Sequence, residues 1–409
     1  MLGIVRSVIS PIWSIGLLML GSAFFLSFIS MKMKLAGMDA TVIGYVHSAY
    51  YFGLWVGAMR VERLIRRIGH IRAFAAFIGI TVASMMIQGL NGHPLVWVVM
   101  RFFAGISLAG VYVVIESWLL DKSTLETRGQ ILAIYMISIY GAQSISQFIL
   151  DGINITSAEP FLVAGLICSL SAIPVATTRA ISPELHEPTL PNILELFKIA
   201  PFGCLGCILA GFILSAIYSF TPNYALATNV SVSWMVSLTI LGGVLLQWPI
   251  GKLSDLYDRR NILIMVSLAT IIPAIGILYF PGNATVVYPL VFVLGGLCFT
   301  LYPLSITQVC DHIESHNITA ITGVLLLAYG IGAAFGPLTA PLLMKYVGPS
   351  GLYIYIAIIA GILSFVGICR HIWGADVPKE DQGDFVPLPR SGSVALDLDP
   401  RTDEEEESE

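Results

Sequence analysis

The amino-acid sequence predicts an all-α polytopic membrane protein with twelve transmembrane helices. The chain has 409 residues, of which 56% are hydrophobic and 11% are charged. An average soluble domain carries roughly 25% charged residues, and its cores could not bury so much apolar side chain. Apolar stretches fill most of the length. Composition therefore excludes soluble, collagen-like, disordered and disulfide-scaffold classes.

The expected spans follow from the length of each apolar stretch, because crossing a bilayer as a helix takes about 20 mostly apolar residues. Twelve stretches reach that length. They cover residues 11–31, 42–61, 71–90, 94–120, 129–150, 158–178, 199–222, 232–253, 261–280, 285–310, 320–344 and 350–373.

The distribution of cationic residues predicts the orientation. Of the 21 Lys and Arg residues, 17 fall in segments on the same side as the N-terminus, three fall on the opposite side, and Arg101 lies within a span. Positive charge is retained on the cytoplasmic side of a membrane. We therefore expect a multi-pass protein of the cell membrane with both termini in the cytoplasm.

One polar stretch divides the chain. Residues 179–198 contain three prolines among charged residues and form the only long polar segment between spans. We expect an N-terminal six-helix bundle at 1–178, a cytoplasmic linker at 179–198 and a C-terminal six-helix bundle at 199–373.

The two halves repeat. The segment 94–98 (PLVWV) returns as 289–293 (PLVFV), and the same offset of 195 residues carries Glu116 onto Asp311. Two similar halves of like orientation are related by an axis along the membrane normal, which favours a solute site at that axis and a rocking motion between the halves.

The C-terminal tail differs from the rest of the chain. Residues 374–409 hold 12 acidic and 3 basic residues and end in a run of glutamates. Such a segment repels itself in water. We expect 374–409 to be an acidic, disordered cytoplasmic tail that transport does not require.

Polar side chains on the spans are candidates for the wall of a solute cavity. Arg101 lies seven residues after Pro94, about 10 Å along the helix, where a charge is costly unless it is paired or hydrated. It could bind an anionic substrate, relay protons, or cap neighbouring carbonyls in a structural role. The uncharged candidates suit a neutral or amphipathic organic solute, or else serve helix–helix hydrogen bonding. The candidates are His47, Tyr51, Arg101, Tyr112, Tyr140, Gln143, Gln147, Thr300 and Thr307.

A second set of charged residues forms a candidate cytoplasmic gate. Glu116 and Asp311 end equivalent helices, and each is either a proton-binding site or one half of a latch that pairs with loop arginines. In the latch, Arg63 or Arg67 serves Glu116 and Arg259 serves Asp311, while Asp255 meets the N-terminus of the fifth span. The gate residues are Arg63, Arg67, Glu116, Arg128, Asp255, Arg259, Arg260 and Asp311.

Other patterns favour structure over chemistry. Small residues recur every fourth position at Ala328, Gly332, Gly336 and Ala340, a spacing that lets a neighbouring helix approach closely. The polar cluster at 311–316 and the two cysteines at 204 and 207 are better explained without a metal. We expect no metal, cofactor, catalytic residue or nucleic-acid partner, and no nucleotide-binding loop of the Walker type is present.

Two motifs resemble signatures of the major facilitator superfamily. Residues 251–260 (GKLSDLYDRR) place an acid four residues after a glycine and a basic pair at a helix start, although Asp258 stands where the family usually has a second glycine. In the first half the matching acid is missing, because Val61 occupies its place. Arg101 followed by Gly105 resembles the second signature of the superfamily.

Further motifs resemble the bacterial YcaD-like branch. They are 116–119 (ESWL), 126–129 (ETRG) and 332–337 (GAAFGP). The resemblance covers about residues 1–373. It implies secondary transport and names no substrate. Together with the polar residues of the spans, it leads us to expect a monomeric transporter of the bacterial inner membrane that moves a small organic solute by alternating access, coupled to protons. Two alternatives remain: a non-transporting sensor or receptor on a transporter scaffold, and a multidrug exporter. A membrane-embedded enzyme is disfavoured, because it would need clustered acid, base or nucleophile residues and the spans contain only scattered ones.

Overall fold

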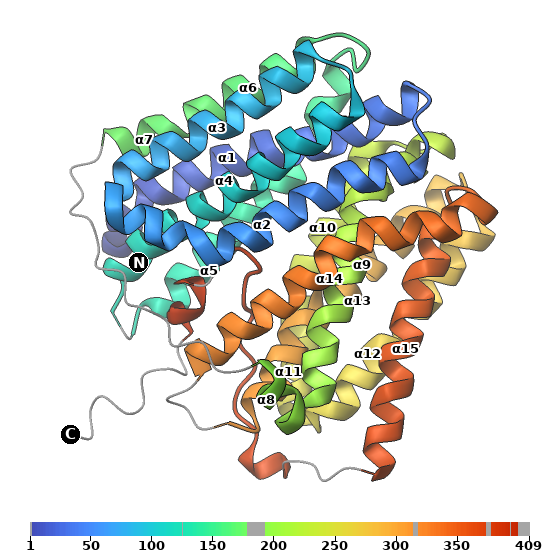
Figure 1. Cartoon of the computed structure of the whole chain (residues 1–409). Helices are drawn as coiled ribbons and strands as arrows, with labels where there is room; N and C mark the ends of the chain where they lie inside the picture. Colours follow the sequence, from blue (N-terminus) through green and yellow to red (C-terminus); the bar gives the residue numbers. More distant parts are fainter. Residues whose placement is uncertain are drawn as a thin grey trace. The chain divides into compact units, whose positions relative to one another are not determined.

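The computed structural model describes residues 2–124, 126–177, 193–313, 318–373, 378–392 and 394–399. Every regular element among them is a helix (Figure 1). The chain forms two compact units. The first comprises Met1–Gly37, Tyr45–Pro188 and Pro389–Glu409, and the second comprises Met38–Gly44 and Thr189–Leu388. The expected linker lies outside the described residues except for its last part, and the tail is divided between the units.

The N-terminal half of the chain contains seven α-helices and one 3-10 helix within the described ranges. They are α1 (Leu2–Leu35), α2 (Ala40–Ile68), α3 (His70–Leu90), α4 (Pro94–Asp121), α5 (Arg128–Ser146), η1 (Gln147–Gly152), α6 (Glu159–Leu170) and α7 (Ala172–Ala176).

The second unit contains α8 to α15, and two 3-10 turns follow in the tail. The helices are α8 (Ile193–Ile199), α9 (Pro201–Ala227), α10 (Val232–Leu245), α11 (Gln247–Leu256), α12 (Arg259–Tyr279), α13 (Ala284–Cys310), α14 (Ile318–Val347) and α15 (Gly351–Trp373), and the turns are η3 (Lys379–Asp381) and η4 (Val394–Leu398).

Eleven helical stretches within the described ranges are long and apolar enough to cross a membrane. Three of them join consecutive elements: α5 with η1, α6 with α7, and α10 with α11. The twelfth expected span coincides with α2, which has 29 residues but interrupts its apolar face with Tyr45, His47 and Tyr50. The chain is therefore an all-helical membrane protein, with boundaries within a few residues of those expected for most spans.

Close helix crossings depend on glycine in both units. In the second unit, a Cβ on Gly332 of α14 would lie 1.9 Å from the carbonyl oxygen of Ile208 on α9, and one on Gly211 would lie 2.2 Å from that of Tyr329. Only a residue without a side chain fits such contacts. This confirms the packing interpretation of the small-residue pattern in α14.

A similar crossing in the first unit positions a charged residue. A Cβ on Gly105 of α4 would lie 2.1 Å from the carbonyl oxygen of Tyr50 on α2, and one on Gly53 would lie 2.1 Å from that of Phe102. The backbones of α2 and α4 therefore touch here. Because Arg101 lies one turn before Gly105, this contact brings its side chain next to α2.

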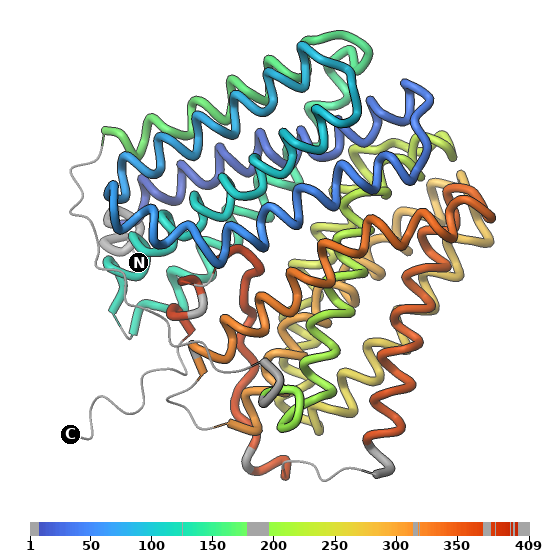
Figure 2. The backbone as a smooth tube through the Cα atoms, in the orientation of Figure 1, coloured from blue at the N-terminus to red at the C-terminus, as the bar shows by residue number. Residues whose placement is uncertain are grey.

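The tail is extended chain with short helical turns (Figure 2). Several of its apolar side chains are buried, among them Leu388, Ala395 and Leu398. The structure thus differs from the expectation of a disordered tail over 378–392 and 394–399. The reason is compositional: the acidic residues are interrupted by two short apolar runs, 385–388 (FVPL) and 394–395 (VA), which contain buried side chains. The glutamate-rich end of the tail lies outside the described residues.

Candidate functional site

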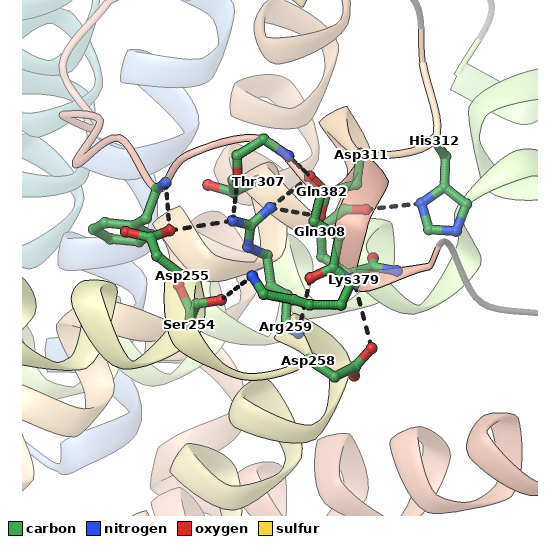
Figure 3. A network of polar contacts seen from close by, with 12 residues as sticks. Ser254, Asp255, Asp258, Arg259, Thr307, Gln308, Asp311, His312, Lys379 and Gln382 are labelled. Atoms are coloured by element: carbon green, nitrogen blue, oxygen red, sulfur yellow. Dashed lines mark hydrogen bonds and ion pairs between the residues drawn. The ribbon is translucent and has the colours of Figure 1, made fainter.

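A buried ion pair lies where α12 begins and α13 ends. The N-cap Asp258 accepts a hydrogen bond from the backbone N–H of Asn261 at 3.0 Å and so starts α12. Arg259, the first residue of the helix, is fully buried and donates from Nη1 to both carboxylate oxygens of Asp311, with 2.5 Å to Oδ2. Its Nη2 lies 3.4 Å from Oδ1 of Asp255 (Figure 3). The Arg259–Asp311 pair expected from the sequence is present.

The tail completes this network. Arg259 Nη2 donates to the carbonyl oxygen of Gly383 at 2.5 Å, and the Gly383 N–H donates to Asp311 Oδ1 at 3.2 Å. The N–H of Phe385 donates to Asp255 Oδ1 at 2.7 Å. Gln382 accepts from the backbone N–H of Arg259 and donates to Asp258 Oδ2 at 3.3 Å (Figure 3). Backbone groups of the tail thus form additional hydrogen bonds with the arginine and the two carboxylates of this network.

Arg260, the other member of the basic pair, has a separate role. It is buried and donates from Nη1 to the carbonyl oxygen of Arg370 near the end of α15, at 3.2 Å. The last carbonyls of a helix have no partner within the helix, and a cation there also complements the helix dipole. Arg260 therefore links α12 to α15, while Arg259 forms the ion pairs with Asp255 and Asp311.

Glu116, the residue equivalent to Asp311, has different partners. It is fully buried at the C-terminal end of α4 and accepts a hydrogen bond from the Tyr135 hydroxyl of α5 at 2.7 Å. Its other oxygen accepts from the backbone N–H of Ala395 in the tail, at 3.1 Å. Arg63 and Arg67, the expected partners, are exposed and make no ion pair with it. The carboxyl group is thus held by neutral donors.

A further tail contact lies beside α5. Arg390 donates from Nη2 to the Tyr140 hydroxyl at 3.2 Å, and its guanidinium carbon is 5.7 Å from the centre of that ring. Arg128, at the first position of α5, is half-buried. Of the residues expected in the cavity and the gate, Tyr140 and Glu116 therefore contact the tail within the first unit, as Asp255, Arg259 and Asp311 do within the second.

Arg101 lies among aromatic side chains. It is 3% exposed, and its guanidinium carbon is 4.3 Å from the ring centre of Tyr50 and 5.7 Å from that of Phe25. Its Nε and Nη2 atoms have no hydrogen-bond partner in the described part of the chain. His47, one turn before Tyr51 on α2, bonds to the Ser30 hydroxyl through Nε2 at 2.6 Å, and its Nδ1 has no such partner. We call Phe25, His47, Tyr50 and Arg101 the Arg101 cluster.

The remaining cavity candidates make local contacts. Tyr112 and Gln143 both donate to the sulfur of Met19, at 3.3 and 3.7 Å. Gln147 donates to the carbonyl oxygen of Gln143, one turn earlier. Thr300 and Thr307 bond to the carbonyls four residues before them, within α13. Each of these side chains forms at least one hydrogen bond within its own helix or to one neighbouring helix, while the Oε1 atom of Gln147 is buried without a partner among the described residues.

No group of three or more His, Cys, Asp or Glu side chains within the described ranges could hold a metal ion. Cys204 and Cys207 are buried in α9 as free thiols. Of the polar cluster at 311–316, the last residues, including Glu314 and His316, lie outside the described part.

Sequence reasoning missed several contacts. Nothing in the sequence marks Tyr135 as the hydrogen-bond donor to Glu116. Phe25 is one of several apolar residues in α1, and nothing in the sequence marks it as a neighbour of Arg101. The tail residues carried one signal, the short apolar runs within an acidic segment.

These features together define a polytopic membrane protein built from two helical units with ionisable side chains at helix ends. A model of the Major Facilitator Superfamily matches residues 12–323 and, in a second match, residues 203–387. The chain belongs to this superfamily.

Its relatives include uncharacterised transporters of the YcaD type. The chain is 32% identical over 328 residues to an uncharacterised MFS-type transporter of Enterobacter sp. (strain 638), covering 78% of this chain and 84% of that one. It is 30% identical over 332 residues to the uncharacterised MFS-type transporter YcaD of Escherichia coli, covering 80% and 85%.

Solved structures share the fold at low sequence identity. The nucleoside transporter NupG aligns with a TM-score of 0.75 at 14% identity, over 90% of this chain and 99% of that one. A D-xylose–proton symporter aligns with a TM-score of 0.69 at 12% identity, over 91% and 98%. At such low sequence identity, the structural similarity shows a shared fold and says nothing about the substrate of this chain.

Proposed function

We propose that the protein is a secondary active transporter that moves a small organic solute across the bacterial inner membrane by alternating access, coupled to protons. Membership of the superfamily supports the class. The observation that carries the mechanism is the buried Arg259–Asp311 pair at the ends of α12 and α13. We place this end of the helices at the cytoplasmic side, in accordance with the charge bias of the loops.

The ion pair suits one half of a cytoplasmic gate. A buried arginine–carboxylate contact is held strongly only while water is excluded, since hydration restores the favourable solvation of both charges. Closing this end of the second unit therefore favours the pair, and opening it to water weakens it. Asp311 and Arg259 thus act as a latch in the proposal.

Glu116 fits the other role considered for the repeated acid. Its partners are the Tyr135 hydroxyl, the Ser391 side chain and the backbone N–H of Ala395, and no cation of the described residues forms an ion pair with it. A buried carboxylate without a cation is the kind of group that binds a proton, because the neutral form avoids the cost of burying charge. We propose that the equivalent positions have diverged, with Asp311 as the latch and Glu116 as the proton site.

Solute flux in liposomes tests the proposal. Purified protein would be reconstituted and a library of labelled organic solutes screened for uptake, with and without an imposed pH gradient. We expect at least one solute to accumulate against its gradient when the pH gradient is present and to exchange without it. Accumulation that does not depend on the pH gradient would contradict proton coupling but would still support a transporter.

A sensor built on the same scaffold is the second candidate, and the packed tail is the observation that favours it. Binding of a solute to purified protein with no flux in liposomes would support the sensor. Flux by the purified protein would exclude it.

A further inference from the structure

We infer that the Arg101 cluster binds the carboxylate of an organic monoanion that carries an apolar or aromatic body. This inference rests on the proposed function and names the substrate class for it. It replaces the neutral solute expected from the uncharged candidates. All four residues lie in the first unit, so the site is assembled within one unit.

The first argument is the uncompensated charge. Arg101 is 3% exposed, seven residues into a membrane-spanning helix. No ion pair joins it to a carboxylate of the described chain, and its Nε and Nη2 atoms donate to no described acceptor. A charge at such depth is expensive unless it is paired. A bound anion would supply the missing partner.

The second argument is the geometry around the guanidinium. The ring centre of Tyr50 lies 4.3 Å from its central carbon and that of Phe25 lies 5.7 Å away, so two aromatic rings lie beside the cation. Aromatic faces stabilise a cation without using its N–H groups. Those N–H groups remain available in the plane of the guanidinium, where two parallel bonds to a carboxylate form.

The third argument concerns the neighbouring histidine. His47 is fully buried, interacts electrostatically with Arg101, and has Nδ1 without a hydrogen-bond partner among the described residues. Its Nε2 is fixed by Ser30. One ring nitrogen next to an arginine is therefore available for a polar group of the ligand, while the rings of Phe25 and Tyr50 contact its apolar body.

A purely structural arginine would look different. Capping of carbonyls, the structural role considered for Arg101, requires its nitrogens to donate to backbone oxygens. Two of the three do not do so within the described residues. Lys32, in the same unit, shows what a structural cation does: its Nζ donates to three consecutive carbonyls at Ile155, Thr156 and Ser157.

Matched pairs of probes test the inference on the purified full-length protein. Benzoate, phenylacetate and hexanoate would each be compared with the corresponding amide, and the thermal unfolding midpoint Tm measured. We expect carboxylates to raise the Tm and amides to leave it unchanged. R101Q should abolish the carboxylate response, R101K should weaken it because an ammonium cannot bind both oxygens in one plane, and K32Q should retain it. Equal responses to acids and amides, a retained response in R101Q, or no response to any carboxylate would overturn the inference.

A ligand-free measurement keeps the test independent of the probe set. Replacing a buried unpaired charge by an apolar side chain of similar length removes a desolvation cost. R101M should therefore have a Tm equal to or above that of the unmodified protein in the absence of ligand. A clearly lower Tm would show that Arg101 is structural and would overturn the inference. Carboxylate binding without flux in liposomes would instead leave the site intact and contradict the proposed transport.

A different observation, the docking of the tail, carries a second inference. We propose that tail residues 389–392 and 394–395 act as an intramolecular strap over Glu116 of the first unit and slow transport. The segment up to Leu388 belongs to the second unit and bonds to Asp255 and Asp311. The segment from Pro389 belongs to the first unit and bonds to Glu116.

The contacts between the tail and Glu116 are close enough for the strap to regulate access to this carboxyl group. Glu116 accepts from the Ala395 N–H, and a Cβ on Gly392 would lie 2.2 Å from its Oε2, so the strap passes directly over the carboxyl group. A proton site covered in this way exchanges protons only after the strap is released.

A glycine pair provides the variant and its control. G392V should displace the strap, because its side chain overlaps Glu116, whereas G383A meets no atom within 4 Å and should leave the strap in place. Trypsin cleavage after the half-buried Arg390 reports release directly. We expect several-fold faster cleavage in G392V and unchanged cleavage in G383A.

Transport rates complete the test. We expect G392V, and a chain ending at residue 377, to transport several-fold faster than the full-length protein, with an unchanged elution profile on size exclusion. Rates at or below that of the full-length protein in both well-folded variants would overturn the inference. Cleavage after Arg390 is measurable whether or not any solute is transported, so failure of the strap and failure of the proposed function are distinguishable.

Discussion

Arg259 and Asp311 form an ion pair in which the arginine side chain is 0% and the aspartate side chain 4% exposed. The pair links the first residue of α12 to the residue that follows α13, and the tail residue Gly383 bonds to both partners. Because the pair is buried, breaking it should lower the stability of the protein more than breaking a surface pair would.

Asp311→Asn should destabilise the protein. Removing the carboxylate leaves a fully buried guanidinium short of its main partner, and such losses cost on the order of 3 kcal/mol. The matched control is Asp121→Asn, because Asp121 pairs with Lys122 at 2.8 Å with side chains 37% and 41% exposed, and exposed pairs contribute about 1 kcal/mol or less. Unfolding midpoints of both variants in the same detergent check this. Equal effects would mean that the buried pair is not a special contact.

Gly332→Ala should destabilise the crossing of α9 and α14. The new methyl group would lie 1.9 Å from the carbonyl oxygen of Ile208, so one helix has to move; overpacking of this kind costs about 1–3 kcal/mol. In Gly141→Ala, a helix-interior control in α5, the methyl group meets no atom within 4 Å, and alanine stabilises a helix relative to glycine by roughly 0.5–1 kcal/mol. The two Tm shifts should therefore have opposite signs, and shifts of the same sign would contradict the packing.

The fold was predictable because its signals are local. A stretch of apolar residues reports a span by length alone, and the fourfold spacing of small residues in α14 reports a close crossing. The weakest case is α2, where Tyr45, His47 and Tyr50 dilute the apolar stretch, and it is the one expected span that does not reach the hydropathy of the other eleven.

The candidate site was predictable only in part, because its contacts join residues far apart in the chain. The repeat indicated Asp311 as a partner of Arg259, since both halves place an acid beside a basic loop. The same reasoning assigned Arg63 or Arg67 to Glu116, but the structure places Tyr135 and the tail there. Charge alone makes arginines the first candidates for the partner of Glu116. In the structure, the short apolar runs of the tail determine which segment packs against α4 beside it.

Labelling of engineered cysteines tests the proposed orientation. Single cysteines would be placed in the 151–157 loop and in the 180–190 segment, and intact cells treated with a membrane-impermeant thiol reagent. We expect the first site to react and the second to react only after permeabilisation, because the cationic loops lie on the side of the second site. The reverse pattern would contradict a cytoplasmic location of both termini.

Glu116→Gln separates the two roles considered for the repeated acid. Glutamine keeps the size, and its single carbonyl oxygen can accept from either Tyr135 or Ala395, which bond to different oxygens of the carboxylate. It cannot bind or release a proton. If Glu116 is the proton site, the variant should exchange substrate at a rate close to that of the unmodified protein and lose the flux driven by a pH gradient. The accessibility of engineered cysteines on the two sides of the membrane should then stay unchanged.

The matched control for this experiment is Tyr135→Phe, which removes the hydroxyl donor and keeps the carboxyl group. Under the proton-site proposal it should retain pH-driven flux and shift its pH dependence, because the hydroxyl stabilises the charged form of Glu116. If Glu116→Gln instead raised accessibility from the cytoplasmic side while keeping pH-driven flux, Glu116 would be a latch like Asp311, and the proposed divergence of the two halves would be wrong.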